Sequence, residues 1–235
     1  PNEVYVVDPG DALESLRYLT QHNLTLCGIL VTHWHPDHVG GIDALTASFP
    51  SIPVIGPKSE KIPMVTHCVQ DGDTISVFDQ NINIIATPGH TLEHIVYFIA
   101  ESHQLFCGDT LFSAGCGRMF EGTPSLFTES LKKIGQLPDD TLIYCAHEYT
   151  LQNLEFAKTV ESNNQDILNY YANTQKLRAE NTMTLPSTLG VEKKINPFLR
   201  LTQPNMLSQL TAMDKLSPTH TNTSDTFKVL REWKD

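Results

Sequence analysis

The first two-thirds of the chain alternate short, continuously apolar runs with helix-like segments, and this alternation limits the fold more than any other feature. Runs such as "TLCGILV", "HIVYFIA" and "TLIYCA" have strand length and carry no polar alternation. Strands of that kind belong to sheets that are covered on both faces. The segments "DALESLRYLTQHN", "HVGGIDALTASFP" and "SLFTESLKKIGQLP" have helical apolar spacing. We therefore predict an α/β fold of the α+β type, with sheets enclosed by helices.

The sequence pattern changes near Glu148. "YTLQNLEFAKTVES" and "NQDILNYYANTQKLRAEN" are long and helix-periodic, and a last helical piece is "DTFKVLREWKD". The Pro- and Thr-containing stretch between them, "TLPSTLGVEKKINPF", is predicted to be a connection. We divide the chain into a mixed domain over 1–149 and a helical domain over 150–235. Because the chain opens without Met and almost inside a strand, "EVYVVDP", we expect that a first strand is missing.

The amino-acid composition limits which partners the protein can bind and which cellular compartment it suits. The net charge of −11 disfavours nucleic acid, and no apolar run approaches the ~20 residues that a membrane span needs. The 5 cysteines show no CxxC spacing, which indicates a reducing compartment rather than a disulfide framework. We therefore expect a cytoplasmic monomer without nucleic-acid or membrane partners. Organellar targeting stays open because the natural N-terminus is expected to be missing.

The strongest chemical signal is "VTHWHPDHVGG", residues 31–41. It places His33, His35, Asp37 and His38 directly after an apolar run. Burying three imidazoles and a carboxylate without a metal would cost several kcal/mol of desolvation. In an extended segment His33 and His35 point to the same side and can bind one ion, whereas the next two residues turn away with the chain. The spacing therefore indicates two metal sites.

Three further residues follow apolar runs in the same way: His90, Asp109 and His147. Functional residues gather at strand ends, and strands that share a sheet edge bring such ends together. His90 could complete the first metal site and His147 the second, with Asp109 between them. Each of the three is a weak signal alone, because a single His or Asp is as often structural. The imidazole and carboxylate donors suit zinc, but also iron or manganese.

These motifs resemble the metallo-β-lactamase fold superfamily, whose signature is THxHxDH, and in particular glyoxalase II, the hydroxyacylglutathione hydrolases. The resemblance covers nearly the whole chain and is carried by "VVDPGDA", "VTHWHPDHVGG", "ATPGHT", "LFCGDTLFSAGCGR", "LPDDTLIYCAHEYTLQN" and "LREWKD". It implies an αββα sandwich of two mixed sheets, which corresponds to the domain 1–149. It also implies that the helical domain 150–235 helps to bind substrate.

The resemblance assigns two divalent metal ions, zinc in the first place and iron or manganese as alternatives. The ligands that it implies for one ion are His33, His35 and His90. The ligands that it implies for the other are Asp37, His38 and His147. Asp109 resembles the bridging aspartate, and with Asp37, which can orient the attacking hydroxide, it forms the predicted catalytic pair. Asp8, in "VVDPG", is expected to orient a ligand histidine, or else to be a turn residue.

The resemblance also implies a pocket for glutathione. Arg118, in "GCGR", and Tyr149, in "HEYT", resemble residues that meet the glutathione moiety. Arg231 and Lys234, in "REWKD", resemble a C-terminal basic pair that holds a glutathione carboxylate. The alternatives are a solvated loop arginine for Arg118 and an ordinary charged helix face for the C-terminal pair.

The activity that the resemblance implies is hydrolysis of the thioester of S-(2-hydroxyacyl)glutathione. The chief substrate would be S-D-lactoylglutathione, cleaved to glutathione and D-lactate by a hydroxide between the two metals, as in methylglyoxal detoxification. Two alternatives remain open. One is a glutathione persulfide dioxygenase with a single iron, which an incomplete second ligand set would favour. The other is a catalytically silent metal-binding scaffold, which missing ligands would favour.

Overall fold

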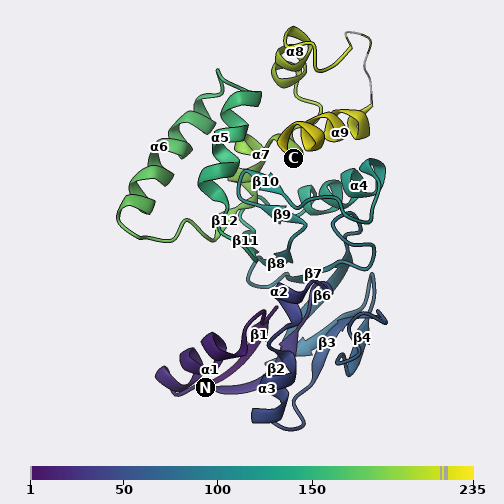
Figure 1. Cartoon of the computed structure of the whole chain (residues 1–235), viewed down its shortest axis with the longest axis vertical. Helices are drawn as coiled ribbons and strands as arrows, with labels where there is room; N and C mark the ends of the chain where they lie inside the picture. The colour runs from purple at the N-terminus through teal and green to yellow at the C-terminus, as the bar shows by residue number, and fades with distance from the viewer. Residues whose placement is uncertain (1, 218, 220–221) are drawn as a thin grey trace. The chain divides into compact units, whose positions relative to one another are not determined.

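The computed structural model describes residues 2–217, 219 and 222–235 (Figure 1). The chain forms two compact units, the first made of Pro1–Ala86 and Glu93–Ala100 and the second of Thr87–Leu92 and Glu101–Asp235. The boundary that we predict after residue 149 was drawn from the change in sequence pattern, and it stays a prediction. Among the described residues, no helix is long and apolar enough to cross a membrane.

The first unit alternates strands with helices and then continues in strands alone. In chain order its elements are β1 (Glu3–Val7), α1 (Ala12–Gln21), β2 (Thr25–Leu30), α2 (Pro36–Val39), α3 (Ile42–Ser48), β3 (Val54–Pro57), β4 (His67–Val69), β5 (Thr74–Val77), β6 (Gln80–Ala86) and β7 (Ile95–Ile99). β1 to β4 form a parallel sheet in that order, and β5, β6 and β7 pair as an antiparallel meander.

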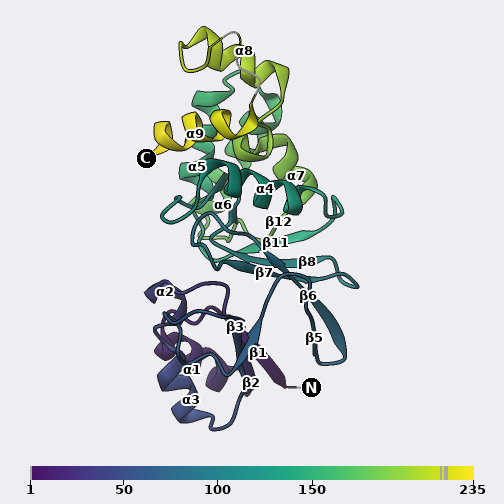
Figure 2. The same cartoon turned by 90° about the vertical axis from the view of Figure 1, so that its right-hand side faces the viewer.

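The core of the first unit explains its apolar runs. α1 and α3 lie on one face of the parallel sheet (Figure 2), where Leu19, Ile29 and Leu45 are buried. Each such side chain stabilises the fold by about 1.5–3 kcal/mol relative to an exposed one. On β7, the fully buried Tyr97 donates its hydroxyl to the carbonyls of Val31, at 2.8 Å, and Ile55, at 3.0 Å. The hydroxyl thereby ties the meander to β3 and to the residue after β2, two positions before the first predicted metal ligand.

The helix predicted for residues 38–50 is interrupted, because α2 ends before Gly40 and α3 begins after Gly41. A β-carbon at Gly41 would lie 2.7 Å from the Pro9 carbonyl oxygen and from the Ala12 nitrogen. The loop that precedes α1 therefore needs glycine at this point. The predicted ligands Asp37 and His38 therefore lie in the short helix α2, which is separate from α3.

The second unit combines short strands with most of the helices. In chain order its elements are β8 (Gln104–Gly108), β9 (Leu111–Phe112), β10 (Gly115–Cys116), α4 (Pro124–Gly135), β11 (Leu142–Cys145), α5 (Thr150–Val160), α6 (Gln165–Ala179), β12 (Ser187–Thr188), α7 (Leu189–Ile195), the 3-10 turn η1 (Pro197–Leu199), α8 (Pro204–Ala212) and α9 (Thr223–Lys234). β8 and β11 pair in parallel, β11 and β12 pair antiparallel, and β9 and β10 form a separate ribbon.

Four helices confirm the sequence prediction, namely α4, α5, α6 and α9. The connection predicted over "TLPSTLGVEKKINPF" is wrong in part, because it contains β12, α7 and η1, and α8 was not predicted. α7 is only seven residues long, too short for a clear helical period, although Thr188 caps it by accepting a hydrogen bond from the Val191 nitrogen. In the second unit α5 and α6 lie side by side (Figure 1).

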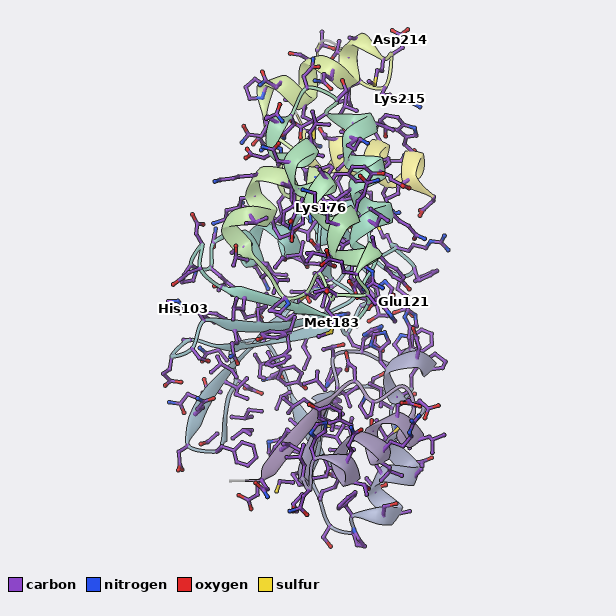
Figure 3. All side chains as sticks on the ribbon, turned by 90° about the vertical axis from the view of Figure 1, so that its left-hand side faces the viewer. His103, Glu121, Lys176, Met183, Asp214 and Lys215 are labelled. Carbon is purple, nitrogen blue, oxygen red and sulfur yellow. The ribbon has the colours of Figure 1, made fainter. Side chains whose placement is uncertain are left out.

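The ribbon of β9 and β10 lies against these helices. Ala114, in its turn, belongs to one buried cluster with Leu154 of α5, Ile167 of α6 and Ile195 of α7. At the other end of the helical region Asp214 and Lys215, which follow α8, point outward (Figure 3) and are exposed. The helices thus bury one side against the ribbon.

Candidate metal centre

The motif of the first unit spans the loop after β2, with His33 and His35, and the helix α2, with Asp37 and His38. His35 has extended backbone (φ −59°, ψ 144°), and Pro36 begins α2, so the chain turns between the two halves of the motif. The Nε2 atom of His33 lies 3.1 Å from Nδ1 of His35, and Nε2 of His38 lies 3.6 Å from a carboxylate oxygen of Asp37. The loop therefore presents two separate pairs of donors, as the spacing predicts.

Asp8 fixes the orientation of both histidines that are buried in this loop. Its Oδ2 accepts from His38 Nδ1 at 3.0 Å and from the Thr32 hydroxyl at 2.6 Å, and its Oδ1 accepts from the Thr32 nitrogen at 2.7 Å. The Thr32 oxygen in turn lies 2.9 Å from Nδ1 of His33. A proton on each Nδ1 leaves Nε2 as the metal-binding nitrogen, and a carboxylate in this position is typical of metal sites.

Asp8 thus contacts a predicted ligand histidine, as we expect from the sequence. Thr32 was not predicted, although its place directly before the first histidine of the motif is a signal that could have found it. His94, which directly precedes β7, is fully buried and stacks its ring on His33 at a centroid distance of 4.7 Å. The His33 ring is therefore held by its hydrogen bond and by packing.

The second unit brings together the other three predicted ligands at strand ends. His90 follows β6, Asp109 follows β8 and His147 follows β11. One oxygen of Asp109, Oδ2, lies 3.5 Å from Nε2 of His90, and the other, Oδ1, lies 3.6 Å from Nε2 of His147. A carboxylate that turns one oxygen toward each of two imidazoles has the arrangement that a bridging ligand requires.

The carbonyl of Arg118 orients His90. His90 Nδ1 donates to it at 2.7 Å, so the other ring nitrogen faces Asp109. Gly117 is needed beside them, because a β-carbon there would lie 2.1 Å from the Asp109 carbonyl oxygen and 2.9 Å from His90 Nδ1. The hydrogen bond from His90 to the Arg118 carbonyl could not be predicted, because every residue has a backbone carbonyl and the sequence does not show which one is used.

The donor geometry in each unit fits divalent metal ions. Two ligands that are about 2.0–2.2 Å from one tetrahedral ion lie roughly 3.3–3.6 Å apart. The pairs within the first unit are separated by 3.1 and 3.6 Å, and those within the second by 3.5 and 3.6 Å. Imidazole and carboxylate donors without thiolates suit zinc, iron or manganese. The residues present therefore fit the predicted kind of metal.

The predicted substrate residues of the second unit fall into two classes. Arg118 has an exposed side chain, 65% accessible, whose Nε lies 3.5 Å from Asp235. Tyr149 is also exposed, and its ring stacks on that of His147 at 5.1 Å and meets Phe112 edge-on at 5.3 Å. Both side chains are accessible from solvent, and Tyr149 lies directly beside a predicted metal ligand. Their contact with substrate stays a prediction.

The other two predicted substrate residues, on α9, are largely buried. Arg231 is 5% exposed and donates to the carbonyls of Cys116, at 3.1 Å, and Gly117, at 3.4 Å. Lys234 donates to Oδ1 of Asn153, and burial lowers its pKa to about 8. Both residues thus have internal partners that the sequence did not reveal, and their role in substrate binding stays a prediction.

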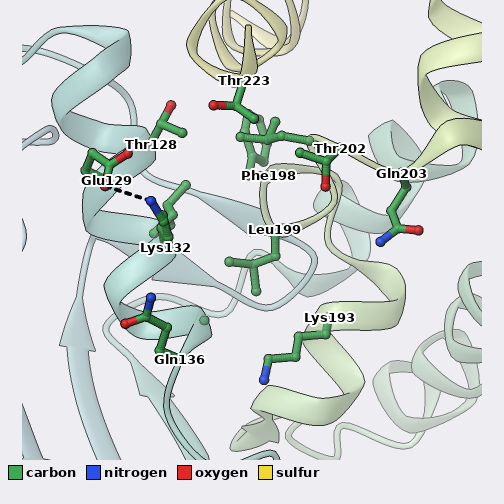
Figure 4. A pocket seen from close by; sticks show the side chains of 13 residues that line it. Thr128, Glu129, Lys132, Gln136, Lys193, Phe198, Leu199, Thr202, Gln203 and Thr223 are labelled. Carbon is green, nitrogen blue, oxygen red and sulfur yellow. Dashed lines mark hydrogen bonds and ion pairs between the residues drawn. The ribbon is translucent and has the colours of Figure 1, made fainter. Parts of the chain in front are cut away.

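A pocket of about 510 Å³ lies elsewhere in the second unit, among α4, α7, η1 and α9 (Figure 4). Lys132, which pairs with Glu129, and Lys193 stand at its edges, and Phe198 and Leu199 are among its apolar lining residues. None of the predicted metal ligands lines it. The donor geometry, rather than this cavity, therefore defines the candidate site.

Comparison with known proteins defines the class of the fold. Residues 1–147 match the family described as "Metallo-beta-lactamase superfamily". The crystal structure of the BLEG-1 B3 metallo-beta-lactamase aligns over 84% of this chain and 89% of its own, with a TM-score of 0.63 and 24% identity. A protein solved in a di-iron-bound form, TTHA1623, aligns over 82% of this chain and 87% of its own, with a TM-score of 0.58 and 25% identity. The fold is the metallo-β-lactamase fold, and this prediction is confirmed. The expectation of two mixed sheets is wrong for the described strands β1 to β4, which pair only in parallel.

The match of the helical region identifies one family within this superfamily. Residues 148–235 match the family described as "Hydroxyacylglutathione hydrolase C-terminus". A hydroxyacylglutathione hydrolase of Photobacterium profundum is 47% identical over 234 residues, which span 100% of this chain and 90% of the relative. The chain therefore belongs to the hydroxyacylglutathione hydrolase family of the metallo-β-lactamase superfamily. It is a metallohydrolase, and its fold and donor set are those of an enzyme that uses divalent metal ions.

Proposed function

We propose that the protein hydrolyses the thioester of S-(2-hydroxyacyl)glutathione, and chiefly S-D-lactoylglutathione, to glutathione and D-lactate. The observation that carries this proposal is Asp109, which turns one carboxylate oxygen toward each of two ligand histidines in the second unit. The similarity to hydroxyacylglutathione hydrolases along the entire chain supports the choice of substrate.

We propose that the seven donors hold two metal ions with the ligand sets that the sequence predicts. His33, His35 and His90 would hold one ion, and Asp37, His38 and His147 the other, with Asp109 shared. Support comes from the donor spacings within each unit and from the hydrogen bonds that orient the imidazoles. We propose zinc as the metal, with iron as the first alternative because a similar protein was solved in a di-iron-bound form.

Bound divalent metals bring the ionisation of water close to neutral pH and stabilise negative charge on a carbonyl oxygen. The protein supplies the orientation of the donors. Asp8 and Thr32 keep the Nδ1 protons of His38 and His33 in hydrogen bonds, and the Arg118 carbonyl does the same for His90. Asp37 has a side chain that is 60% exposed, and we propose that it also accepts a hydrogen bond from the attacking water.

The substrate would be held by the cationic and aromatic residues of the second unit. Arg118 offers an exposed guanidinium that can bind a glutathione carboxylate in a bidentate manner. The Tyr149 ring, packed on His147, would contact the glutathione moiety beside the reacting carbonyl. Lys234, with a pKa of about 8, stays mostly protonated at neutral pH, so it adds positive charge near the end of α9 together with Arg231. A thiolate leaves readily, so no strong general acid is required.

We propose a cytoplasmic monomer that acts on a small molecule. All 5 cysteines are unpaired thiols, which agrees with a reducing compartment. Size-exclusion chromatography with light scattering would test the oligomeric state.

The test of this function is the loss of thioester absorbance from S-D-lactoylglutathione. We expect rapid hydrolysis that a chelator abolishes and that added zinc restores. His90→Gln should reduce turnover by at least about 100-fold because it removes a ligand. The matched control is His103→Gln, since His103 is at the surface and pairs with Asp140 at 2.8 Å. No hydrolysis by folded, metal-loaded protein would refute the proposal, and oxygen uptake with glutathione persulfide would then identify the dioxygenase alternative.

A further inference from the structure

Two polar side chains of α7 are fully buried in the helical region, Glu192 and Asn196, which closes the helix. Burial raises the pKa of the Glu192 carboxyl, which is the expected consequence of placing this group away from water. Buried carboxylates of this kind are retained only where several donors satisfy them. Neither residue is a predicted ligand or a predicted substrate contact, so their partners indicate what they do.

Most of their partners lie in one element, the hairpin formed by β9, the turn Ser113–Ala114 and β10. Glu192 accepts from the Ser113 hydroxyl at 2.9 Å and from the Ala114 nitrogen at 2.7 Å. The Asn196 amide donates to the carbonyls of Phe112, at 3.1 Å, and Gly115, at 2.9 Å, and also to Glu192 at 3.1 Å. The two residues thus bind both strands and the turn of the hairpin from one side.

The hairpin cannot keep this shape without such contacts. It pairs only two residues on each side, and isolated ribbons of that size are unstable in water. Ala114 has a φ of +56°, in the left-handed region that residues with a β-carbon disfavour. A non-glycine residue stays in this region where its surroundings impose the conformation. The hydrogen bond from the Ala114 nitrogen to Glu192 is one of the contacts that hold it, together with the bonds of Asn196 to the carbonyls of Phe112 and Gly115.

The two ends of the hairpin are attached to metal ligands. Asp109 precedes β9 by two residues, and Gly117 follows β10 directly against the Asp109 carbonyl. The backbone carbonyl of the next residue, Arg118, accepts the hydrogen bond from His90 Nδ1. A shift of the hairpin would therefore move the Asp109 carboxylate and the partner of the His90 ring at the same time.

We infer that Glu192 and Asn196 are positioning residues for the metal centre, because they lock the β9–β10 hairpin that sets Asp109 and orients His90. The inference rests on the proposed metal centre and goes beyond the role in substrate binding that we expect for the helical region. It assigns to α7 a part in holding metal, although α7 itself supplies no ligand.

The test compares Glu192→Gln with wild type in zinc affinity and in steady-state kinetics. Glutamine keeps the volume but removes the negative charge and one accepting oxygen. The bonds from the Ala114 nitrogen and from Asn196 then end on a neutral, weaker acceptor, and the Ser113 hydroxyl has to turn from donating to accepting. We expect zinc, measured by competition with a chromophoric chelator well below the unfolding temperature, to bind roughly 10–100-fold more weakly. The kcat at limiting zinc should fall in parallel, whereas the KM for S-D-lactoylglutathione should stay within about twofold, since Glu192 does not touch substrate.

The matched control is Glu161→Gln in the same unit. Glu161 is also buried, and it pairs with Arg200 at 2.7 and 2.9 Å without touching the hairpin. This variant should lose thermal stability but keep wild-type zinc affinity. The inference is overturned if Glu192→Gln binds zinc as wild type does, or if both variants weaken zinc equally.

A milder variant keeps the test decisive if Glu192→Gln does not fold. Ser113→Ala removes a single hydrogen bond to Glu192, and we expect zinc to bind a few-fold more weakly. Unchanged affinity in this variant would then overturn the inference. Wild-type protein that binds no zinc at all would instead refute the metal centre, and with it any positioning role.

Discussion

Arg231→Ala provides a sharp test of how the C-terminal helix contributes to this enzyme. The sequence predicts that Arg231 binds substrate, which makes a higher KM the main expected effect. The structure adds a second effect, because the guanidinium is 5% exposed and donates to the Cys116 and Gly117 carbonyls at the end of the hairpin. We therefore expect the variant to lose stability as well as affinity for substrate.

The magnitude follows from the groups that lose their partners. Two hydrogen bonds from a charged donor to carbonyls contribute about 1.5–3 kcal/mol each, with the 3.4 Å contact to Gly117 at the low end. The ion pair with Asp235, whose side chain is 44% exposed, adds at most about 1 kcal/mol. Arg231 Nε is buried without a hydrogen-bond partner among the described residues, so its removal returns roughly 1–3 kcal/mol. The net loss is roughly 2–4 kcal/mol, which lowers Tm by roughly 5–15 °C.

The assay is thermal and urea unfolding at one fixed zinc concentration, because bound metal shifts apparent stability. Arg118→Ala is the matched control, since its guanidinium is exposed and should change stability by no more than about 0.5 kcal/mol while raising KM. The reasoning is refuted if Arg231→Ala unfolds like wild type. A rise in KM without any loss of stability would show that Arg231 acts at the surface, as the sequence alone suggests.

Three further predictions concern metal binding and pH. Asp109→Ala should lower bound zinc from two ions to one or fewer per chain and reduce kcat by at least about 100-fold. Metal analysis and thioester hydrolysis would measure these changes, and near-normal values of both would contradict the bridging role. Asp8→Asn, which disturbs the hydrogen bond to His38, should weaken zinc binding by roughly 10–100-fold in a chelator competition, and an unchanged affinity would exclude the orienting role. Burial, with a smaller contribution from Arg231, lowers the pKa of Lys234 from 10.5 to about 8, so the unfolded chain binds more protons between these values. The contribution of Lys234 to stability should therefore rise from about pH 8 to about pH 10.5 by roughly 3 kcal/mol at most. The buried thiols with raised pKa values act in the opposite direction in both proteins, so the difference between wild type and Lys234→Met in urea unfolding across that range isolates it.

Short-range patterns carried most of the fold prediction. β2 and β7 are continuous apolar runs whose residues are largely buried, and β11 is an apolar run whose residues are buried or half-buried. The long helices α5 and α6 have enough turns for a helical period to be recognised. α7 does not, and its segment was predicted to be a connection because prolines flank it and only seven residues are helical. The residues that we infer to position the metal ligands lie in that segment.

The grouping of the first predicted metal ligands followed from the same short-range patterns. Adjacent residues in an extended loop have known directions, so His33 and His35 were expected to form one pair, and the structure places their ring nitrogens 3.1 Å apart. His90, Asp109 and His147 are isolated in the sequence, and their significance depended on the resemblance to a family. Only the structure showed that the two carboxylate oxygens of Asp109 face His90 and His147.

The sequence by itself determined the donor types, their order along the chain and the family to which the protein belongs. These depend on residue identity and local backbone direction, which are written directly in the chain. Only the tertiary structure decided that Thr32 links Asp8 to His33, that Arg231 is a buried donor, and that Glu192 and Asn196 bind a hairpin about 80 positions earlier. Such contacts join residues that are far apart in the chain, so local sequence patterns do not reveal them. They also depend on burial, because a carboxylate or a guanidinium needs partners within the protein only where water has been excluded.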